Sequence, residues 1–305
     1  MKRGKGLRLG VIGVGSMGKN YARLIADLPG AKLAGVSDSN QQTASEVAAQ
    51  YHSTAYPDYQ QMLPEVDAVC IVTPAQTHFE IASACLNLGK HVLLEKPFTG
   101  STKLATDLLA LSKEKGITLS ASFLERFNPA FARLMKLIKG EKIHGIDIQR
   151  FSPFPERITD TDVVFDMMIH DLDLLSQITS EEIEDIKVEG EKVRSKSLDR
   201  VVATFTHKLG TISRVNANRV YTDRVRKITI TTEKQLIDAD LLNRQIYIRD
   251  FSVLQPSTVP VKEVNQLGAQ LLNFIKAIKE NAPPMITASD AIKALTLAEE
   301  VERLC

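Results

Sequence analysis

Short apolar segments alternate with longer helical stretches over the first 120 residues. The segments rich in β-branched residues span residues 7–12, 33–36, 68–72, 91–94 and 117–121, and each predicts a strand. Between them apolar side chains recur about every 3.6 residues, as in Tyr21, Leu24, Ile25 and Leu28, which predicts helices. Strands and helices in alternation form βαβ units. We therefore expect an α/β fold with a doubly wound parallel sheet.

The pattern changes after residue 122, where we place a domain boundary that divides the chain into residues 1–122 and 123–305. Helices are predicted over residues 129–139, 166–178, 267–280 and 288–304. Strands are predicted over residues 145–151, 186–193, 201–207, 210–220, 225–232, 236–239 and 245–248. Most of these strands follow one another without a helix, which favours an α+β domain with an open, mostly antiparallel sheet.

Composition and charge exclude several classes of protein. The 38 basic and 37 acidic residues give a formal net charge of +1, which argues against a dedicated nucleic-acid binder. No apolar run approaches the roughly 18 residues that span a bilayer, so we expect no membrane partner. Three scattered cysteines, Cys70, Cys85 and Cys305, are typical of a reducing compartment. We therefore expect a cytoplasmic protein.

A glycine-rich loop, Gly13-Val-Gly15-Ser-Met-Gly18, follows the first predicted strand and begins a helical pattern. This spacing allows a tight turn, a close approach of the backbone to a pyrophosphate, and close packing of helix on strand. The amides of Ser16 and Met17 would then lie at a helix N-terminus, which favours anions. The loop predicts a Rossmann dinucleotide-binding domain. The alternative is a structural turn without a ligand.

Asp38 ends the second predicted strand, twenty residues after Gly18. A carboxylate at this place accepts hydrogen bonds from a ribose diol and repels a 2′-phosphate. It therefore favours NAD over NADP as the cofactor. The alternative is a solvated loop residue.

The tripeptide Glu95-Lys96-Pro97 follows the predicted strand at residues 91–94. Reactive groups of open α/β sheets gather at the carboxyl ends of the strands, where this tripeptide lies. A lysine there can act as a general acid or base, provided that burial or a neighbouring cation weakens its hold on the proton. The alternative is an exposed Lys–Glu pair.

Asp166, His170 and Asp173 share one face of the helix predicted over residues 166–178. Asp166 could orient the imidazole of His170, which could relay a proton. A metal site is disfavoured because no further ligand lies nearby, so we expect no metal. The alternative is a half-buried histidine held by its helix neighbours.

Together these residues resemble the Gfo/Idh/MocA family of sugar dehydrogenases. The resemblance rests on the glycine loop, Asp38, Thr73-Pro74 with His78, Glu95-Lys96-Pro97, and Asp166 with His170. It implies that Lys96, Asp166 and His170 form the catalytic group. It also implies a homodimer or homotetramer formed through one face of the second domain's sheet. The cofactor-binding residues it implies, with those of the loop, are Gly13, Gly15, Ser16, Met17, Gly18, Asp38, Thr73, Pro74, His78, Glu95 and Lys96.

A narrower resemblance is to the nucleotide-sugar branch of that family, in particular its UDP-N-acetylglucosamine 3-dehydrogenases. It rests on residues 123–129, 150–157 and 166–174. The implied substrate residues are Arg126, Asn128, Arg157, Asp166 and His170; of these, Arg126 and Asn128 also lie at the domain junction, where a cofactor cleft must open. Asp162 departs from the glycine that is common in this branch.

A basic run offers modest further support for an anionic substrate. Arg214, Arg219, Arg224, Arg226 and Lys227 outnumber Asp223, a local charge of +4. Arginine forks match phosphate oxygens, so this run could hold a diphosphate. The alternative is a hairpin whose charges point to water.

The sequence therefore predicts an NAD-dependent oxidoreductase. We expect it to oxidise a secondary hydroxyl of a sugar, in first place a nucleotide sugar such as UDP-N-acetylglucosamine at C3. A free-sugar or polyol dehydrogenase of the inositol type is the first alternative. The second is a non-catalytic NAD-binding sensor, against which the presence of Lys96, Asp166 and His170 together counts.

Overall fold

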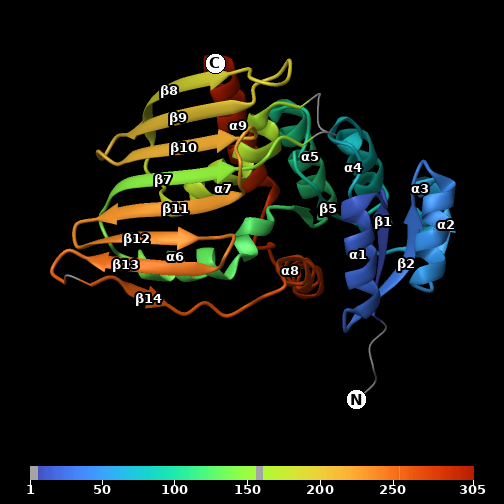
Figure 1. Ribbon diagram of the computed structural model, residues 1–305. Helices are drawn as coiled ribbons and strands as arrows, with labels where there is room; N and C mark the ends of the chain where they lie inside the picture. Colours follow the sequence, from blue (N-terminus) through green and yellow to red (C-terminus); the bar gives the residue numbers. More distant parts are fainter. Residues whose placement is uncertain (1–5, 156–160, 254) are drawn as a thin grey trace. The chain divides into compact units, whose positions relative to one another are not determined.

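The computed structural model describes residues 6–155, 161–253 and 255–305, and the chain divides into two compact units (Figure 1). The first unit comprises Met1–Leu124 and Asn265–Ile292, and the second comprises Glu125–Val264 and Lys293–Cys305. The chain first passes from one unit to the other between Leu124 and Glu125, and we call this point the first chain crossing. It lies close to the boundary placed at residue 122. However, Asn265–Ile292 return to the first unit, whereas the sequence pattern assigned them to the second domain.

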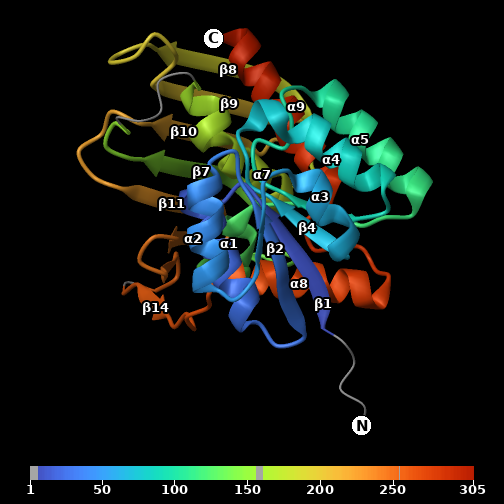
Figure 2. The same cartoon turned by 90° about the vertical axis from the view of Figure 1, so that its right-hand side faces the viewer.

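The first unit contains a six-stranded parallel sheet in the order β3-β2-β1-β4-β5-β6. Its strands β1, β2 and β4 lie side by side in Figure 2. The predicted doubly wound sheet is thereby confirmed, with β3 as an additional edge strand that has no apolar run. The strands are β1 (Leu7–Ile12), β2 (Ala31–Ser37), β3 (Thr54–Tyr56), β4 (Ala68–Ile71), β5 (His91–Leu94) and β6 (Leu119–Ala121).

Helices cover both faces of this sheet. Helices α1 (Ser16–Asp27), α2 (Gln41–Gln50) and α8 (Gln266–Glu280) share one buried apolar cluster with strands β1, β2, β4 and β5. Helix α8 contributes Leu267, Leu271, Phe274 and Ile275 to this cluster, which explains why it belongs to the first unit. Helices α4 (His78–Asn87) and α5 (Thr102–Lys115) contribute nothing to it; they pack against each other, and α4 also contacts β4 and β5. The short helix α3 (Tyr59–Met62) contacts β2.

The second unit contains an eight-stranded sheet in the order β14-β13-β12-β11-β7-β10-β9-β8. Every neighbouring pair is antiparallel except β10 and β7, so the predicted open, mostly antiparallel sheet is confirmed. The short edge strand β14 (Ser257–Val259) has no counterpart in the sequence pattern. The other strands are β7 (Ile143–Phe151), β8 (Ile183–Glu191), β9 (Arg200–His207), β10 (Ile212–Asn218), β11 (Val225–Thr232), β12 (Gln235–Asp240) and β13 (Gln245–Asp250).

One face of this second sheet is apolar and buried. Ile148, Phe205, Val215 and Ile230 alternate with polar neighbours along their strands and are fully or almost fully buried. Helix α6 (Pro129–Leu137) contacts β12 and β13, and helix α7 (Ile169–Ile178) contacts β7 and β10. Helix α9 (Ala288–Leu304) begins in the first unit and continues in the second. Within the described part of the chain, no helix combines the length and apolar character needed to cross a bilayer.

Candidate functional site

The glycine loop between β1 and α1 holds the backbone in a shape that side chains would prevent. Gly13 has a φ of +86°, and a Cβ there would lie 2.7 Å from the carbonyl oxygen of Val72. A Cβ on Gly18 would lie 1.9 Å from the carbonyl oxygen of Gly13, so α1 packs directly on the turn. Gly15 precedes α1 and has open space where a Cβ would be. The helix therefore begins with its first-turn amides next to an open approach.

A cavity of about 740 Å³ lies beside this loop, at the carboxyl ends of β1, β2 and β4. This is the edge of a doubly wound sheet at which ligands bind, beside the strand where the order reverses. The volume falls in the range of small-molecule and cofactor sites, about 300–1,000 Å³. Residues that line it include Gly13, Gly15, Asp38, Tyr59, Thr73, Pro74 and Thr77.

Asp38 lines the cavity and also fastens the glycine loop. Its Oδ2 accepts a hydrogen bond from the Val14 amide at 2.7 Å, and its Oδ1 accepts one from the Asn40 amide at 2.9 Å. Each carboxylate oxygen has a second lone pair that can accept from a ribose hydroxyl. The open Gly15, the first turn of α1 and this carboxylate fit a dinucleotide, because they offer amides to a pyrophosphate and an acceptor to a ribose.

His78 connects the loops that follow β4 and β5. It begins α4 and is fully buried. Its Nδ1 lies 2.8 Å from the carbonyl oxygen of Pro97, and its Nε2 lies 2.9 Å from that of Thr73. The imidazole thus links the backbone of Thr73-Pro74, which line the cavity, with that of the Glu95-Lys96-Pro97 tripeptide.

The tripeptide directly follows β5, as the sequence pattern predicted, and the Lys96–Pro97 peptide bond is cis. The Oε1 of Glu95 accepts hydrogen bonds from the hydroxyls of Tyr21 and Ser122, at 2.7 and 2.8 Å. Its Oε2 accepts the backbone amide of Lys96 at 3.1 Å. Glu95 is therefore oriented by groups from three segments of the first unit.

Asp166 and His170 lie in the second unit, at the start of α7. Asp166 belongs to a π-helical turn, Val164–Met168, and His170 to α7 itself. The helix predicted over residues 166–178 thus begins with a π-helical turn, in which the spacing between backbone partners is one residue wider than in an α-helix. Asp173 is buried and paired with Arg126, whereas Asp166 and His170 are half-buried.

Asp162, where the sequence departs from a common glycine, lies two residues before this turn. Its Oδ1 accepts the amides of Val164 and Phe165, at 2.8 and 3.1 Å. These are bonds of the kind a helix N-cap makes, so the aspartate satisfies first-turn donors. Burial and the neighbouring Asp162 carboxylate together raise the pKa of Glu302.

Arg126 and Asn128, the predicted substrate residues of the first chain crossing, take part in bonds inside the second unit. Arg126 makes a two-pronged ion pair with Asp173, at 2.9 and 3.0 Å. Asn128 caps α6 through the Ala130 amide, and its side-chain nitrogen donates to Glu125 and to the carbonyl of Leu241. Arg157 lies outside the described residues.

Glu125 is the centre of a buried charge network in the same unit. Its Oε1 forms ion pairs with the Nη1 atoms of Arg150, at 3.3 Å, and Arg226, at 2.9 Å. The Nη2 of Arg150 also pairs with the Oδ1 of Asp171 at 2.7 Å. Burial alone would raise the pKa of Glu125, but the two arginines outweigh it and hold the pKa below its usual value. For Asp171 burial outweighs Arg150, and its pKa is raised.

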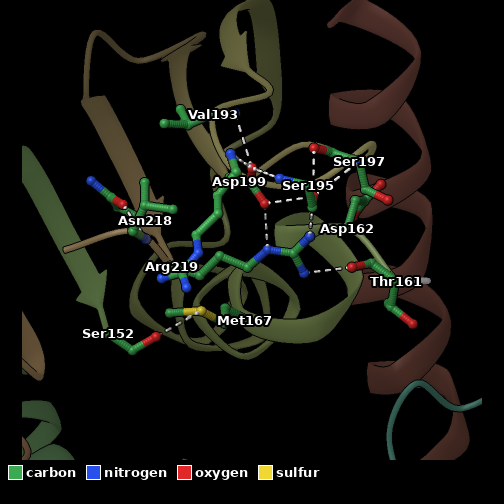
Figure 3. A network of polar contacts seen from close by, with 12 residues as sticks. Ser152, Thr161, Asp162, Met167, Val193, Ser195, Ser197, Asp199, Asn218 and Arg219 are labelled. Atoms are coloured by element: carbon green, nitrogen blue, oxygen red, sulfur yellow. Dashed lines mark hydrogen bonds and ion pairs between the residues drawn. The ribbon is translucent and has the colours of Figure 1, made fainter. Parts of the chain in front are cut away.

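Arg219 is fully buried and holds two segments near the π-turn, as Figure 3 shows. Its Nε donates to Asp199 at 2.9 Å, its Nη2 to Ser195 at 3.1 Å, and its Nη1 to the carbonyl of Thr161, next to Asp162. Asp199 also accepts the amides of Val193, Arg194 and Ser195. Burial raises the pKa of Asp199, but these hydrogen bonds outweigh it and keep the pKa below its usual range.

The basic run is largely neutralised within the second unit. Arg219 pairs with Asp199, and Arg226 pairs with Glu125. Arg214 pairs with Asp147 on the neighbouring strand, and Lys227 lies 3.8 Å from Asp238. The local charge of +4 is therefore balanced by carboxylates that are distant in sequence, and Arg219 is a buried structural group.

Comparison with known proteins identifies the family. The Gfo/Idh/MocA model, described as an oxidoreductase family with an NAD-binding Rossmann fold, matches residues 7–123. The UDP-N-acetylglucosamine 3-dehydrogenase of Acidithiobacillus ferrooxidans is 32% identical over 303 residues, 97% of this chain and 96% of that protein. The chain belongs to the Gfo/Idh/MocA family. It is an oxidoreductase, and its residues 7–123 match the family's NAD-binding Rossmann fold.

Two further similarities extend over nearly the full length of both chains compared. The structure of the Acidithiobacillus enzyme matches with a TM-score of 0.92 and 33% identity, covering 98% of this chain and 97% of that one. The myo-inositol 2-dehydrogenase of Thermotoga maritima is 25% identical over 324 residues, 95% of this chain and 94% of that protein. The predicted family and dehydrogenase class are thus confirmed.

The sequence pattern did not predict three residues as polar neighbours of Glu95: Tyr21, Ser122 and Gln270. One of them left a signal. Gln270 interrupts the apolar stripe of α8 between Leu267 and Leu271, and it is buried. A buried amide on an otherwise apolar stripe needs a polar partner in the core. The partner itself lies about 150 residues away in sequence at Ser122, so no local pattern reveals it.

Gly15→Ala tests whether the open approach at the loop receives the cofactor. The new methyl enters free space and the backbone is not left-handed, so folding stability should not change. We expect NADH affinity, measured by fluorescence titration, to fall about tenfold or more, because the methyl occupies the place where the pyrophosphate approaches. Gly100→Ala is the matched control, since it also faces open space but lies outside the cavity lining. Unchanged affinity in Gly15→Ala would contradict this site.

Arg219→Met tests the buried network in Figure 3. Removing the guanidinium leaves the buried Asp199 carboxylate without its cation, which costs about 3–5 kcal/mol. We expect this loss in the free energy of unfolding, measured by urea denaturation. Arg214→Met, which breaks an exposed pair, should cost about 1 kcal/mol or less. Equal losses in the two variants would show that the buried Arg219–Asp199 pair stabilises the fold no more than the exposed Arg214–Asp147 pair does.

Proposed function

We propose that this dehydrogenase uses NAD to oxidise a secondary hydroxyl of a nucleotide sugar, with C3 of UDP-N-acetylglucosamine as the preferred position. The likeness to the Acidithiobacillus enzyme carries this proposal, because it extends over nearly the full length of both chains, the second unit included. The cavity beside the glycine loop supports it by offering room and polar groups for a dinucleotide.

The chemistry needs a group that removes the hydroxyl proton while the carbinol hydride leaves. When bound, the dinucleotide supplies the hydride acceptor at C4 of its nicotinamide. We assign the proton to Lys96 or His170; the other of the two would stabilise the developing alkoxide. Asp166 would orient this pair. The substrate roles of Arg126, Asn128 and Arg157 stay predictions, as does a homodimer or homotetramer formed through the second sheet.

A free polyol is the second candidate substrate, since the Thermotoga myo-inositol 2-dehydrogenase matches across most of both chains.

For location we propose the cytoplasm. Its support is that Cys70, Cys85 and Cys305 are all free thiols.

The substrate is tested by following NADH absorbance with purified protein and a panel of UDP-sugars and free polyols. We expect UDP-N-acetylglucosamine to be oxidised with a kcat/KM at least about tenfold above that of myo-inositol, because the two differ by a whole set of nucleotide contacts. Activity with myo-inositol and none with UDP-sugars would decide for the polyol. Bound NAD without turnover of any sugar would favour the sensor.

Lys96→Met is the companion variant in this assay. It removes the ammonium and keeps a side chain of similar length, so NADH affinity should stay within about twofold while kcat falls by about three orders of magnitude or more. A kcat near that of the unaltered protein would refute the assignment of Lys96.

Cofactor choice is tested by Asp38→Asn. A carboxylate and a 2′-phosphate at contact distance repel by about 1–4 kcal/mol at effective dielectric constants of 80 to 20. The neutral amide removes this repulsion, so we expect the ratio of kcat/KM for NAD to that for NADP to fall about tenfold or more. The ratio is measured with one sugar substrate and both dinucleotides. An unchanged ratio would show that Asp38 does not select the cofactor.

A further inference from the structure

A closed polar cluster lies in the core of the first unit and joins four segments of the chain. Tyr21 comes from α1, Glu95 follows β5, Ser122 follows β6, and Gln270 comes from α8. Tyr21, Ser122 and Gln270 are almost completely buried. We call these four residues the Glu95 cluster. Uncompensated polar groups at such depth would be costly, so each hydrogen bond in the cluster matters.

The hydrogens available in the Glu95 cluster fix the direction of its bonds. The hydroxyls of Tyr21 and Ser122 have one hydrogen each, and both lie within bonding distance of the Glu95 Oε1, at 2.7 and 2.8 Å. The Gln270 Nε2 carries two hydrogens and lies 2.8 Å from the Tyr21 hydroxyl and 3.1 Å from that of Ser122. The Ser122 hydroxyl also lies 3.1 Å from that of Tyr21 and 3.3 Å from the Gln270 Oε1, but its contact with the charged Glu95 oxygen is shorter and stronger. Gln270 thus donates to both hydroxyls, and both hydroxyls donate to one carboxylate oxygen.

The Tyr21 hydroxyl keeps its hydrogen in this arrangement. Burial, and next the negative charge of Glu95, raise the pKa of Tyr21 well above its usual value. Tyr21 therefore acts as a donor to Glu95 at all ordinary pH values. Flipping the Gln270 amide would place an oxygen 2.8 Å from the Tyr21 hydroxyl, whose hydrogen is already donated to Glu95, so the Gln270 nitrogen faces Tyr21.

The other carboxylate oxygen faces the backbone of the proposed reactive lysine. Oε2 of Glu95 accepts the amide of Lys96 at 3.1 Å. Both oxygens of the carboxylate therefore have donors: Oε1 has the hydroxyls of Tyr21 and Ser122, and Oε2 has the Lys96 amide. Rotating the carboxylate would break bonds at both ends.

We propose that Tyr21, Ser122 and Gln270 are positioning residues of the dehydrogenase. They hold the Glu95 carboxylate in one orientation against the Lys96 backbone, and so fix the place from which the Lys96 side chain extends. The proposal rests on the proposed role of Lys96 in proton transfer. A purely structural cluster would contribute to folding stability alone, and this difference can be measured.

Tyr21→Phe removes one hydroxyl and nothing else from the cluster, and Ser122→Ala is the second variant should the first fold poorly. We expect kcat with the sugar substrate to fall about tenfold, with the KM values for sugar and dinucleotide within about twofold. Hydrogen exchange of the Lys96 amide should become about tenfold faster, because its acceptor is no longer held. Tyr51→Phe is the matched control, since Tyr51 packs against the apolar cluster that contains Tyr21. This control should change neither kcat nor the exchange rate of the Lys96 amide.

A double-mutant cycle with Glu95→Gln tests whether Tyr21 acts through Glu95. In the Glu95→Gln background, Tyr21→Phe should cause no further fall in kcat and no further rise in Lys96 amide exchange. A full additional effect in that background would overturn the proposal. So would faster amide exchange with unchanged kcat, since the cluster would then only brace the fold.

The cluster and the proposed function fail in different ways. If the unaltered protein oxidises no sugar or polyol, the proposed function fails, and amide exchange decides on the cluster alone. Faster exchange at Lys96 in Tyr21→Phe then supports the positioning of this segment, and unchanged exchange refutes it. If the unaltered protein is active and Tyr21→Phe matches it in kcat, the proposed function stands and the positioning proposal is wrong.

Discussion

The close packing of Gly18 on the carbonyl oxygen of Gly13 sets the position of α1 on the binding loop. A Cβ at Gly18 would lie 1.9 Å from that oxygen, so α1 packs on the turn as closely as a backbone can. Tyr21 and Ile25 follow at helical spacing on the same buried face. The contact that places the first-turn amides beside the cavity therefore also directs the Tyr21 hydroxyl to Glu95. One close approach of backbone to backbone aligns the binding loop and the segment that carries Lys96.

The near-zero net charge conceals strong local organisation in the second unit. Arg126, Arg150 and Arg226 face Glu125, Asp171 and Asp173, so three cations meet three anions in and around the core. Such groups cost much to bury, and removing one member leaves the opposite charge uncompensated. The network connects the segment at the first chain crossing with β7, β11 and α7. It therefore holds the shape of the region in which Asp166 and His170 lie.

The sequence was informative where local periodicity determines the structure. The strands of both sheets follow from β-branched runs and alternation, and the glycine loop identified the cofactor side of the fold. Strands β3 and β14 were missed because none of their residues is fully buried, so they leave no apolar pattern. Strand β6, an edge strand of the same length, is buried throughout and was predicted. The unit to which α8 belongs was also missed, since an amphipathic stripe does not show which core it covers.

The candidate site shows the same division between local and distant information. Asp38 and Glu95-Lys96-Pro97 were found from spacing along the chain, and the structure places Asp38 at the cavity and the tripeptide directly after β5. The partners of Arg219 and of Gln270 were not found, because Asp199 and Ser122 are distant in sequence. The basic run appeared uncompensated for this reason, although folding brings a carboxylate to most of its members. Charge counted along a chain therefore overstates the charge that a folded surface presents.

The return of α8 to the first unit has a consequence for autonomous folding. A fragment that ends at residue 122 would lack Leu271 and Phe274, and would leave the apolar faces of α1 and β1 open to water. It would also lack the amide that satisfies the two buried hydroxyls beside Glu95. The nucleotide-binding half of this protein is thus a discontinuous folding unit. Recovering it in isolation requires a chain in which residues 265–292 are joined back to it, as a rearranged order of segments would do.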